Sequence, residues 1–374
     1  MDTTELITLT RQGRPDRGVV TDSDVALALH HNAAVAIGVS GGKDSCALAF
    51  ATVKHLNAIG HTGQRILIHS DLGRVEWRDS LPTCERLSAQ LGIALVTVRR
   101  KAGDMMDRWL VRWENNVERY ANLSCVKLIL PWSTPSMRFC TSELKTAVIC
   151  SELKRRFVGQ TIVSASGIRR QESAKRKLAP VSKAQPKLAS RKAGTTGIDW
   201  HPIIDWSHAD VFAHLAANNF ELHEAYTHYG MSRVSCAFCI MSNENDIINA
   251  ASCVDNQALY REMVDLEIRS TFAFQGAKWL GDAAPHLLDA GTLYALERAK
   301  WKAQRREQVE ARIPDHLLYT AGWPTVMPTP AEADMLAEVR TEIAELLGIT
   351  IACYTGETVH ARYAELMAAK EASC

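Results

Sequence analysis

Short apolar runs alternate with longer segments of helical periodicity over the first two-thirds of the chain. The apolar runs are rich in β-branched residues and predict strands at residues 34–39, 65–70, 94–98 and 161–165. The segments around them predict helices at residues 24–31, 45–55, 80–91, 105–120 and 142–157. This alternation predicts an α/β fold in which a parallel sheet is covered by helices on both faces.

The pattern changes near residue 243. Beyond it the sequence has no comparable strand pattern and predicts helices at residues 258–270, 293–311 and 330–347. We therefore expect a nucleotide-binding α/β domain over residues 1–242 and a mostly helical region over residues 243–374.

The stretch VAIGVSGGKDSCALAF (35–50) joins the first predicted strand to a helix. Two glycines let the backbone approach a ligand closely, and the first N–H groups of the helix have no internal acceptor. A lysine and two serines add a cation and two hydroxyl donors. This composition predicts a phosphate-binding loop, and the absence of G-x-x-x-x-G-K-[ST] disfavours a Walker-type loop.

A basic segment runs from Arg169 to Lys192 and carries nine lysines and arginines against the single acid Glu172. Pro180 and Pro186 argue against a long helix there, because proline interrupts the interior of a helix. Such a charge run is commonly a solvated loop; the functional alternative is a flexible lid over an anionic ligand.

Overall composition narrows the classes of protein. The net charge is +1, so an attraction to nucleic acid must be local. The N-terminal sequence lacks an apolar signal region and no stretch is long and apolar enough to span a membrane, which predicts a cytoplasmic protein. Ten cysteines in such a protein argue against a disulfide scaffold.

The loop Ser40–Ser45 resembles the PP-loop of the adenine nucleotide α-hydrolase superfamily, the N-type ATP pyrophosphatases. Further segments resemble the branch that contains phosphoadenosine phosphosulfate (PAPS) reductases, in the same order. They are ILIHSDLGRVEW (66–77), RFCTSELK (138–145), SGIRRQESAKR (166–176) and HPIIDWSHADVF (201–212). The resemblance implies a HUP/Rossmann-like fold and covers roughly residues 30–240.

The resemblance also implies roles for individual residues. Lys43, Asp44 and Arg169 are the expected catalytic residues, with Mg²⁺ on Asp44 or Asp71. The expected ATP-binding residues are Ser40, Gly41, Gly42, Lys43, Asp44, Ser45, Asp71, Gly73, Glu172 and Arg176. Asp71 has an equally simple alternative role as the N-cap of the following helix.

Cys236 and Cys239 form the one C-x-x-C pair. In iron–sulfur members of the family, a cysteine at the position of Cys140 joins a later C-x-x-C around a [4Fe–4S] cluster. We therefore expect Cys140, Cys236 and Cys239 as ligands, with Cys253 as a candidate for the fourth. A zinc site, a dithiol redox pair and buried structural cysteines are the alternatives.

The sequence departs from the reductases in three ways. It lacks their C-terminal E-C-G-x-H segment, Cys140 is followed by Thr141 rather than a second cysteine, and the SGGKDS loop is intact. These features favour an enzyme of a DndC-like branch that cleaves ATP and activates an acceptor for sulfur transfer. The acceptor would be nucleic acid held by the basic segment, with a sulfur donor or partner protein. The alternatives are a PAPS/APS reductase and a non-catalytic nucleotide-binding regulator or adaptor.

Overall fold

A computed structural model describes residues 3–372, and they form two compact units that interleave along the sequence. The first unit contains the residues up to Met105 and Pro135–Ala258; the second contains Met106–Thr134 and the residues from Leu259 onward. The sequence predicted one division, after residue 242. The difference arises because the helix that follows β3 belongs with the C-terminal helices and not with the sheet.

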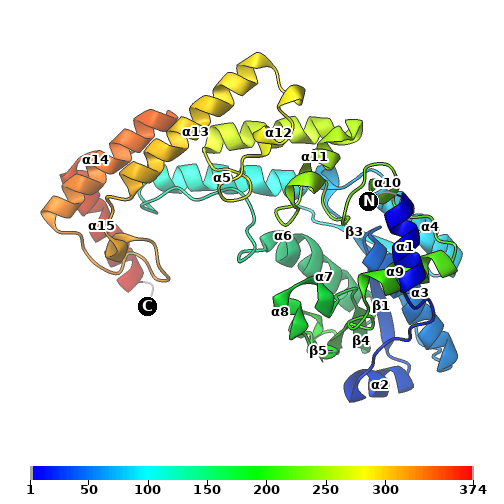
Figure 1. The fold of residues 1–374 in the computed structure, drawn as a ribbon. Coiled ribbons are helices and arrows are strands. Elements are labelled where there is room, and N and C mark those ends of the chain that lie inside the picture. The colour runs from blue at the N-terminus through cyan, green and yellow to red at the C-terminus, as the bar shows by residue number, and fades with distance from the viewer. Residues whose placement is uncertain (1–2, 373–374) are drawn as a thin grey trace. The chain divides into compact units, whose positions relative to one another are not determined.

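The first unit contains one six-stranded sheet within the described residues, in the order β3-β2-β1-β4-β6-β5 (Figure 1). Neighbouring strands are parallel except for β5 and β6, which are antiparallel. The strands are β1 (Ala34–Val39), β2 (Arg65–Asp71), β3 (Leu95–Arg99), β4 (Thr161–Ala165), β5 (Ser182–Ala184) and β6 (Thr196–Trp200). The predicted α/β fold with a largely parallel sheet is confirmed.

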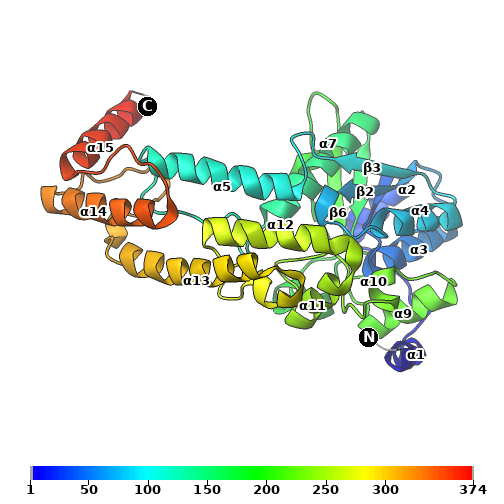
Figure 2. The same cartoon turned by 90° about the horizontal axis from the view of Figure 1, so that it is seen from above.

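Helices cover both faces of this sheet. The helices of the first unit are α1 (Thr3–Gln12), α2 (Ser23–His30), α3 (Lys43–Ala58), α4 (Ser80–Leu91), α6 (Phe139–Thr141), α7 (Ala147–Arg156), α8 (Ala174–Lys177), α9 (His208–Ala217), α10 (Glu224–Thr227) and α11 (Glu244–Ser252). Val35 and Ile37 point into one core with α3, whereas Ala34 and Ala36 point into a second core with α7. Figure 2 shows α3 and α7 on opposite sides of the sheet.

The order of the strands creates a switch point beside β1. Strand β1 pairs with β2 on one side and with β4 on the other, and all three run parallel. The connections leaving the carboxyl ends of β1 and β4 therefore diverge, which opens a crevice at this edge of the sheet. The predicted phosphate-binding loop follows β1 directly.

The basic segment is more ordered than a plain loop. It contains α8, the edge strand β5 and short 3₁₀ turns at Arg170–Glu172 and Pro186–Leu188. Leu188 is buried in the core beneath α7. Strand β5 was not predicted from the sequence because it is only three residues long and largely exposed. Its pairing with β6 stabilises it, rather than an apolar pattern of its own.

The second unit is helical in the part of the chain that the structure describes. Its helices are α5 (Met105–Ala121), α12 (Val254–Ser270), α13 (Ala290–Glu310), α14 (Pro330–Leu347) and α15 (Gly356–Glu371). The first residue of α5 and the first five residues of α12 are assigned to the first unit. An aromatic cluster joins α5 to the C-terminal part of the chain, since Trp132 packs against Trp109 and Phe274 at ring-centre distances of 5.3 and 5.1 Å. None of the helices in residues 3–372 combines the length and apolarity needed to cross a membrane.

Candidate active site

The loop after β1 is held in shape by its own atoms. Gly41 has a φ of +72°, and a Cβ at this position would lie 3.0 Å from the carbonyl oxygen of Ser80, so only glycine fits. The Ser45 hydroxyl accepts a hydrogen bond from the Ser40 N–H (3.1 Å) and donates one to the Gly42 carbonyl (2.9 Å). The loop is thus pre-shaped at the N-terminus of α3.

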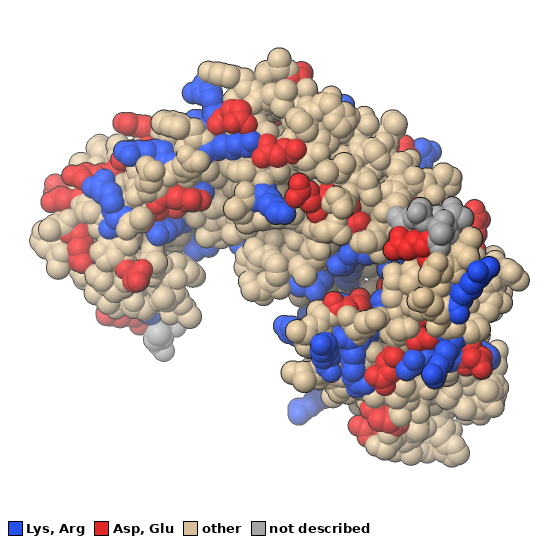
Figure 3. Space-filling view, in the orientation of Figure 1, with Lys and Arg blue, Asp and Glu red and all other residues tan. Residues whose placement is uncertain are grey.

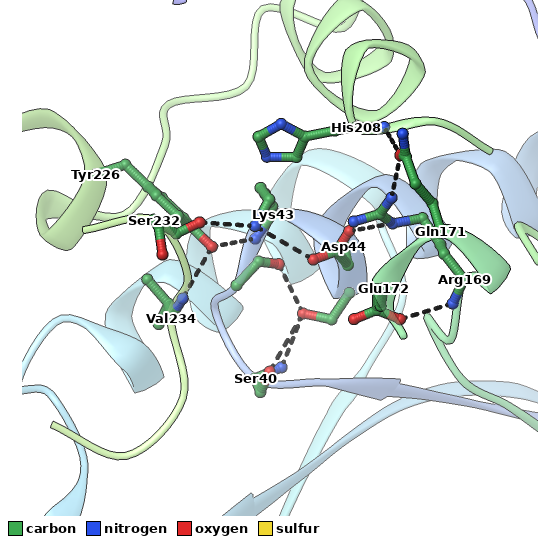
Figure 4. Close-up of polar contacts among 12 residues, drawn as sticks. Ser40, Lys43, Asp44, Arg169, Gln171, Glu172, His208, Tyr226, Ser232 and Val234 are labelled. Atoms are coloured by element: carbon green, nitrogen blue, oxygen red, sulfur yellow. Dashed lines mark hydrogen bonds and ion pairs between the residues drawn. The ribbon is translucent and has the colours of Figure 1, made fainter. Parts of the chain in front are cut away.

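Three charged side chains meet where α3 begins (Figure 4). Asp44 accepts a hydrogen bond from Arg169 Nε at 2.6 Å and lies 3.5 Å from Lys43 Nζ. Lys43 and Arg169 are each only 4% exposed. Burial lowers the pKa of Lys43, and Asp44 offsets this only in part. Burial alone would raise the pKa of Asp44, but Lys43 and Arg169 outweigh it and hold the pKa below its ordinary value.

A distant segment braces the same loop (Figure 4). The buried hydroxyl of Tyr226 accepts hydrogen bonds from the backbone N–H groups of Lys43 (3.2 Å) and Val234 (3.1 Å). Lys43 Nζ donates to the carbonyl of Ser232 at 3.2 Å. Ser232 is in turn fixed by Asp246, which accepts from its N–H and its hydroxyl at 2.7 Å each. The phosphate-binding loop and the segment just before Cys236 are therefore tied together.

A cavity of about 520 Å³ opens beside the loop, within the first unit. It lies at the carboxyl ends of β1, β2 and β4, and the phosphate-loop residues Ser40, Gly42, Lys43, Asp44 and Ser45 line it. Its other charged and titratable lining residues are Lys145, Arg169, Glu172, Arg176, His208 and Arg233. Five of the lining side chains are lysines or arginines and two are acids, so the cavity favours an anionic ligand.

Glu172 organises the arginines at the cavity. Its carboxylate accepts a hydrogen bond from the Arg169 N–H at 2.8 Å and forms an ion pair with Arg176. Arg170 instead pairs with Asp205 and does not line the cavity. The structure therefore brings Arg169, Glu172 and Arg176 to the phosphate-binding loop, as a ligand-binding role for them requires.

Asp71 and Gly73 lie apart from these residues. The Asp71 carboxylate accepts a hydrogen bond from the Gly73 N–H at 2.7 Å, and Arg99 lies 3.8 Å from it. Neither Asp71 nor Gly73 lines the cavity. This hydrogen bond closes a local turn, but Asp71 is not the N-cap of the following helix, because Leu72 precedes the 3₁₀ turn at Gly73–Val75 and Asp79 precedes α4. Asp44 is the aspartate that lines the cavity.

Three of the four candidate cysteines lie near one another. Burial raises the pKa of Cys236 to about 12; Lys145 opposes this effect, while Cys239, Glu76 and Cys140 add to it. All three of these cysteines are partly exposed. Across residues 3–372, however, no three cysteine, histidine or acidic side chains converge as the ligands of a single metal ion would.

Cys253 has different surroundings. It is 2% exposed, follows α11, and its thiol pairs with the Tyr229 hydroxyl, a contact that helps raise the pKa of Tyr229 to about 12. It is not among the main groups that shift the pKa of Cys236. Cys150 is a residue of α7 and points into the buried core between that helix and the sheet.

Comparison with known proteins assigns this chain to a family. The family model for the phosphoadenosine phosphosulfate reductase domain matches residues 34–242, which is more than half of the chain. The chain belongs to the phosphoadenosine phosphosulfate reductase domain family. The family predicted from the sequence segments is thus confirmed, whereas a DndC-like branch within it remains a prediction.

A curated relative adds little about activity. It is an uncharacterized 37.8 kDa protein in the gpa 5′ region of Escherichia phage 186, which is 25% identical over 244 residues and is matched over 56% of this chain and 68% of its own length. Family membership therefore remains the main functional information that sequence comparison provides.

Two solved structures are similar to this chain at a low level. The PAPS reductase of Candida auris, in a phosphate complex, is 13% identical with a TM-score of 0.37, covering 63% of this chain and 96% of that one. The U34-tRNA thiolase NcsA of Methanococcus maripaludis, with its [4Fe–4S] cluster, is 14% identical with a TM-score of 0.29, covering 83% and 80%. At these scores neither likeness bears on the activity of this chain.

Sequence reasoning missed several residues of the site. Tyr226 and Arg233 lie between the family-like segments and the C-x-x-C pair and were given no role, and neither was His208, although it lies in the segment 201–212. Burial, with Lys43 and Arg169 nearby, lowers the pKa of His208 to about 4. Lys145 lies within a family-like segment but received no role. For Arg233, the one local signal in the sequence was its position three residues before the C-x-x-C pair.

Proposed function

We propose that the protein binds ATP in the cavity beside the phosphate-binding loop and cleaves it between the α- and β-phosphates. The observation that carries this proposal is the intact loop, pre-shaped at a helix N-terminus and surrounded by Lys43, Arg169 and Arg176. A loop and helix terminus of this kind suit a pyrophosphate group, which a sulfonucleotide does not have.

The reaction would be an adenylation. An oxygen of the acceptor attacks the α-phosphorus, the bond from that phosphorus to the bridging oxygen breaks, and pyrophosphate leaves with the bonding electrons. Lys43 would offset the charge that builds on the bridging oxygen, and the two arginines would hold the phosphates. Asp44 would hold Mg²⁺, because that carboxylate lines the cavity, and the ion would supply positive charge to offset that of the phosphates.

The activated acceptor would then receive sulfur: a sulfide-level sulfur attacks the activated centre, the bond from that centre to the adenylated oxygen breaks, and AMP leaves with that oxygen. We propose Cys140, Cys236 and Cys239 as ligands of an iron–sulfur centre, because Cys140 and Cys239 both lie near enough to Cys236 to help raise the pKa of its thiol. Thiolates of a cluster bind separate irons and need not meet at one point, unlike the four ligands of zinc. When bound, such a centre would supply a site for a transferable sulfide. Cys253 is left out of this set because it is buried and its thiol pairs with the Tyr229 hydroxyl.

The family match keeps a second function in view, the reduction of a sulfonucleotide. That reaction needs a nucleophilic thiol, and the chain lacks the E-C-G-x-H segment that supplies it in PAPS reductases. The terminal Cys374 lies outside the described residues. A regulator that binds ATP without turnover is the third possibility.

Calorimetric titration with ATP and with PAPS separates these functions. We expect ATP to bind more tightly than PAPS, and Lys43→Ala to weaken ATP binding about tenfold or more, since it removes a charge-assisted contact. Lys54→Ala is the matched control because Lys54 is an exposed residue of the same helix, outside the cavity. Tighter binding of PAPS, or equal effects of the two variants, would count against the proposal.

The metal centre has its own test. The protein would be purified without oxygen, alongside Cys236→Ser, and examined for visible absorption, iron and sulfide. We expect a brown wild-type protein with iron and sulfide in similar amounts, and loss of both in the variant. A colourless wild-type protein without iron would reject the cluster and leave the ATP site as a separate question.

A further inference from the structure

Positive charge is concentrated in one part of the first unit. Residues 152–192 contain twelve lysines and arginines and two acids, a net charge of +10, whereas the whole chain carries +1. The remaining residues therefore carry a net charge of −9. Figure 3 shows these basic side chains gathered over the region that Figure 1 labels α7, α8 and β5.

The fold joins two sequence segments into this surface. Leu153 of α7 and Phe157, which directly follows α7, share a buried core with Leu188, which follows β5, so the end of α7 lies against the segment 182–192. Burial raises the pKa of the Cys150 thiol, and Lys187 and Lys154 both lie near enough to that thiol to oppose this rise. We define the basic surface as Lys154, Arg155, Arg156, Lys175, Arg176, Lys177, Lys183, Lys187, Arg191 and Lys192.

Much of this charge is available to a ligand. Glu152 pairs with Arg155 and Arg156, Glu172 pairs with Arg176, and Asp199 pairs with Lys183. Within residues 3–372, no acidic side chain forms an ion pair with the other members of the basic surface. These are Lys154, Lys175, Lys177, Lys187, Arg191 and Lys192, and all except Lys154 are exposed.

The basic surface reaches the edge of the cavity. Arg176 belongs to both, and Glu172 connects it to Arg169 beside the phosphate-binding loop. An anionic polymer lying on the surface would therefore present one of its groups to the cavity. In contrast, the large apolar side chains exposed nearby, Leu178 and Val158, are isolated and form no membrane-inserting face.

We propose that this surface binds the phosphate backbone of a nucleic acid and presents it to the nucleotide cavity as the acceptor. Exposed lysines and arginines recognise phosphates without regard to base sequence. Binding itself follows from the surface alone, whereas the role as acceptor rests on the proposed ATP cleavage.

The test is the binding of a fluorescein-labelled RNA stem-loop and of a DNA duplex of the same sequence, followed by anisotropy over a range of salt concentrations. We expect binding at about 0.15 M salt, and Lys175→Glu/Lys177→Glu to weaken it about tenfold or more. The slope of log affinity against log salt should become shallower by about 2, since each lost phosphate contact removes about 0.9. The arm that binds more tightly identifies RNA or DNA as the source of the backbone.

A control variant with the same charge change makes the result specific. Lys54→Glu/Lys101→Glu alters two exposed lysines outside the basic surface and should leave the affinity within about twofold of wild type. Equal losses in both variants, or no nucleic-acid binding by the wild type, would overturn the proposal. So would binding to phosphatidylserine vesicles in preference to both nucleic acids. None of these results depends on ATP turnover.

Discussion

Asp44 shows how a single residue can organise a site. Its carboxylate contacts both Lys43 and Arg169, so one negative charge compensates two buried cations. The sequence placed Asp44 in a phosphate-binding loop but gave no indication of Arg169 as its partner, 125 positions away. An anionic phosphate would strengthen this arrangement, because two positive side chains then face two negative groups.

His223 makes stability depend on pH. It is 1% exposed, its Nδ1 accepts a hydrogen bond from the Ala225 N–H, and it packs against the loop at Gly41. Burial lowers the pKa of His223 to about 4, despite the nearby Asp79. Between about pH 6.5 and pH 4, the unfolded chain binds a proton that the folded protein does not, so stability falls as the pH falls.

We expect wild-type protein to lose about 2 kcal/mol of unfolding free energy through this group between pH 7 and pH 5. Urea titrations of wild type and His223→Gln across this range measure the effect. The variant should be less stable at pH 7 but should lose less on acidification. Identical pH profiles would show that His223 is protonated in the folded state or does not contribute.

At the scale of elements, the best predictions concerned segments with a strong pattern of their own. Strands β1 and β4 and helices α4 and α14 occur with the predicted bounds. Strand β6 was missed because TGIDW has few apolar residues, and its edge partner β5 has fewer. The phosphate-binding loop was found because its residues are contiguous. Tyr226 and Ser232 could not be found in the same way, since they reach the loop from more than 180 positions away.

The junction of two elements yields a sharp prediction at Gly167. A Cβ on this residue, just after β4, would lie 2.9 Å from the carbonyl oxygen of Asp44 and 3.3 Å from the Ser45 nitrogen. We expect Gly167→Ala to displace the start of α3 and to weaken ATP binding about tenfold, measured by calorimetry. Gly18→Ala is the control because a Cβ there meets nothing within 4 Å. Unchanged affinity in Gly167→Ala would mean that the loop tolerates this shift.

At the scale of the whole molecule, the two units share one interleaved chain. Most of α5 belongs to the second unit, where Trp109 and Trp113 pack against Phe274 and Phe272. The family match ends at residue 242, before both of these phenylalanines. The matched domain therefore carries a helix whose apolar side chains are covered by residues that follow it.

This arrangement predicts the outcome of truncation. A chain ending at Ala258 retains the whole sequence of the first unit but loses the residues that cover α5. We expect it to expose Trp109 and Trp113, bind a hydrophobic dye and aggregate on heating, because buried aromatic surface becomes accessible to water. The full-length protein under the same conditions is the control. A truncated chain that stays dye-silent and melts cooperatively would show that α5 does not need the C-terminal helices.

The most direct test of the central claim follows the fate of ATP. Wild-type protein would be incubated with Mg²⁺ and with ATP labelled on the α- or the γ-phosphate, with RNA and DNA offered as acceptors. The account predicts that the α-label appears in AMP or on the acceptor and that the γ-label appears in pyrophosphate, with both products lost in Lys43→Ala and retained in Lys54→Ala. Release of ADP and phosphate, or no ATP cleavage combined with thiol-dependent reduction of PAPS, would contradict it.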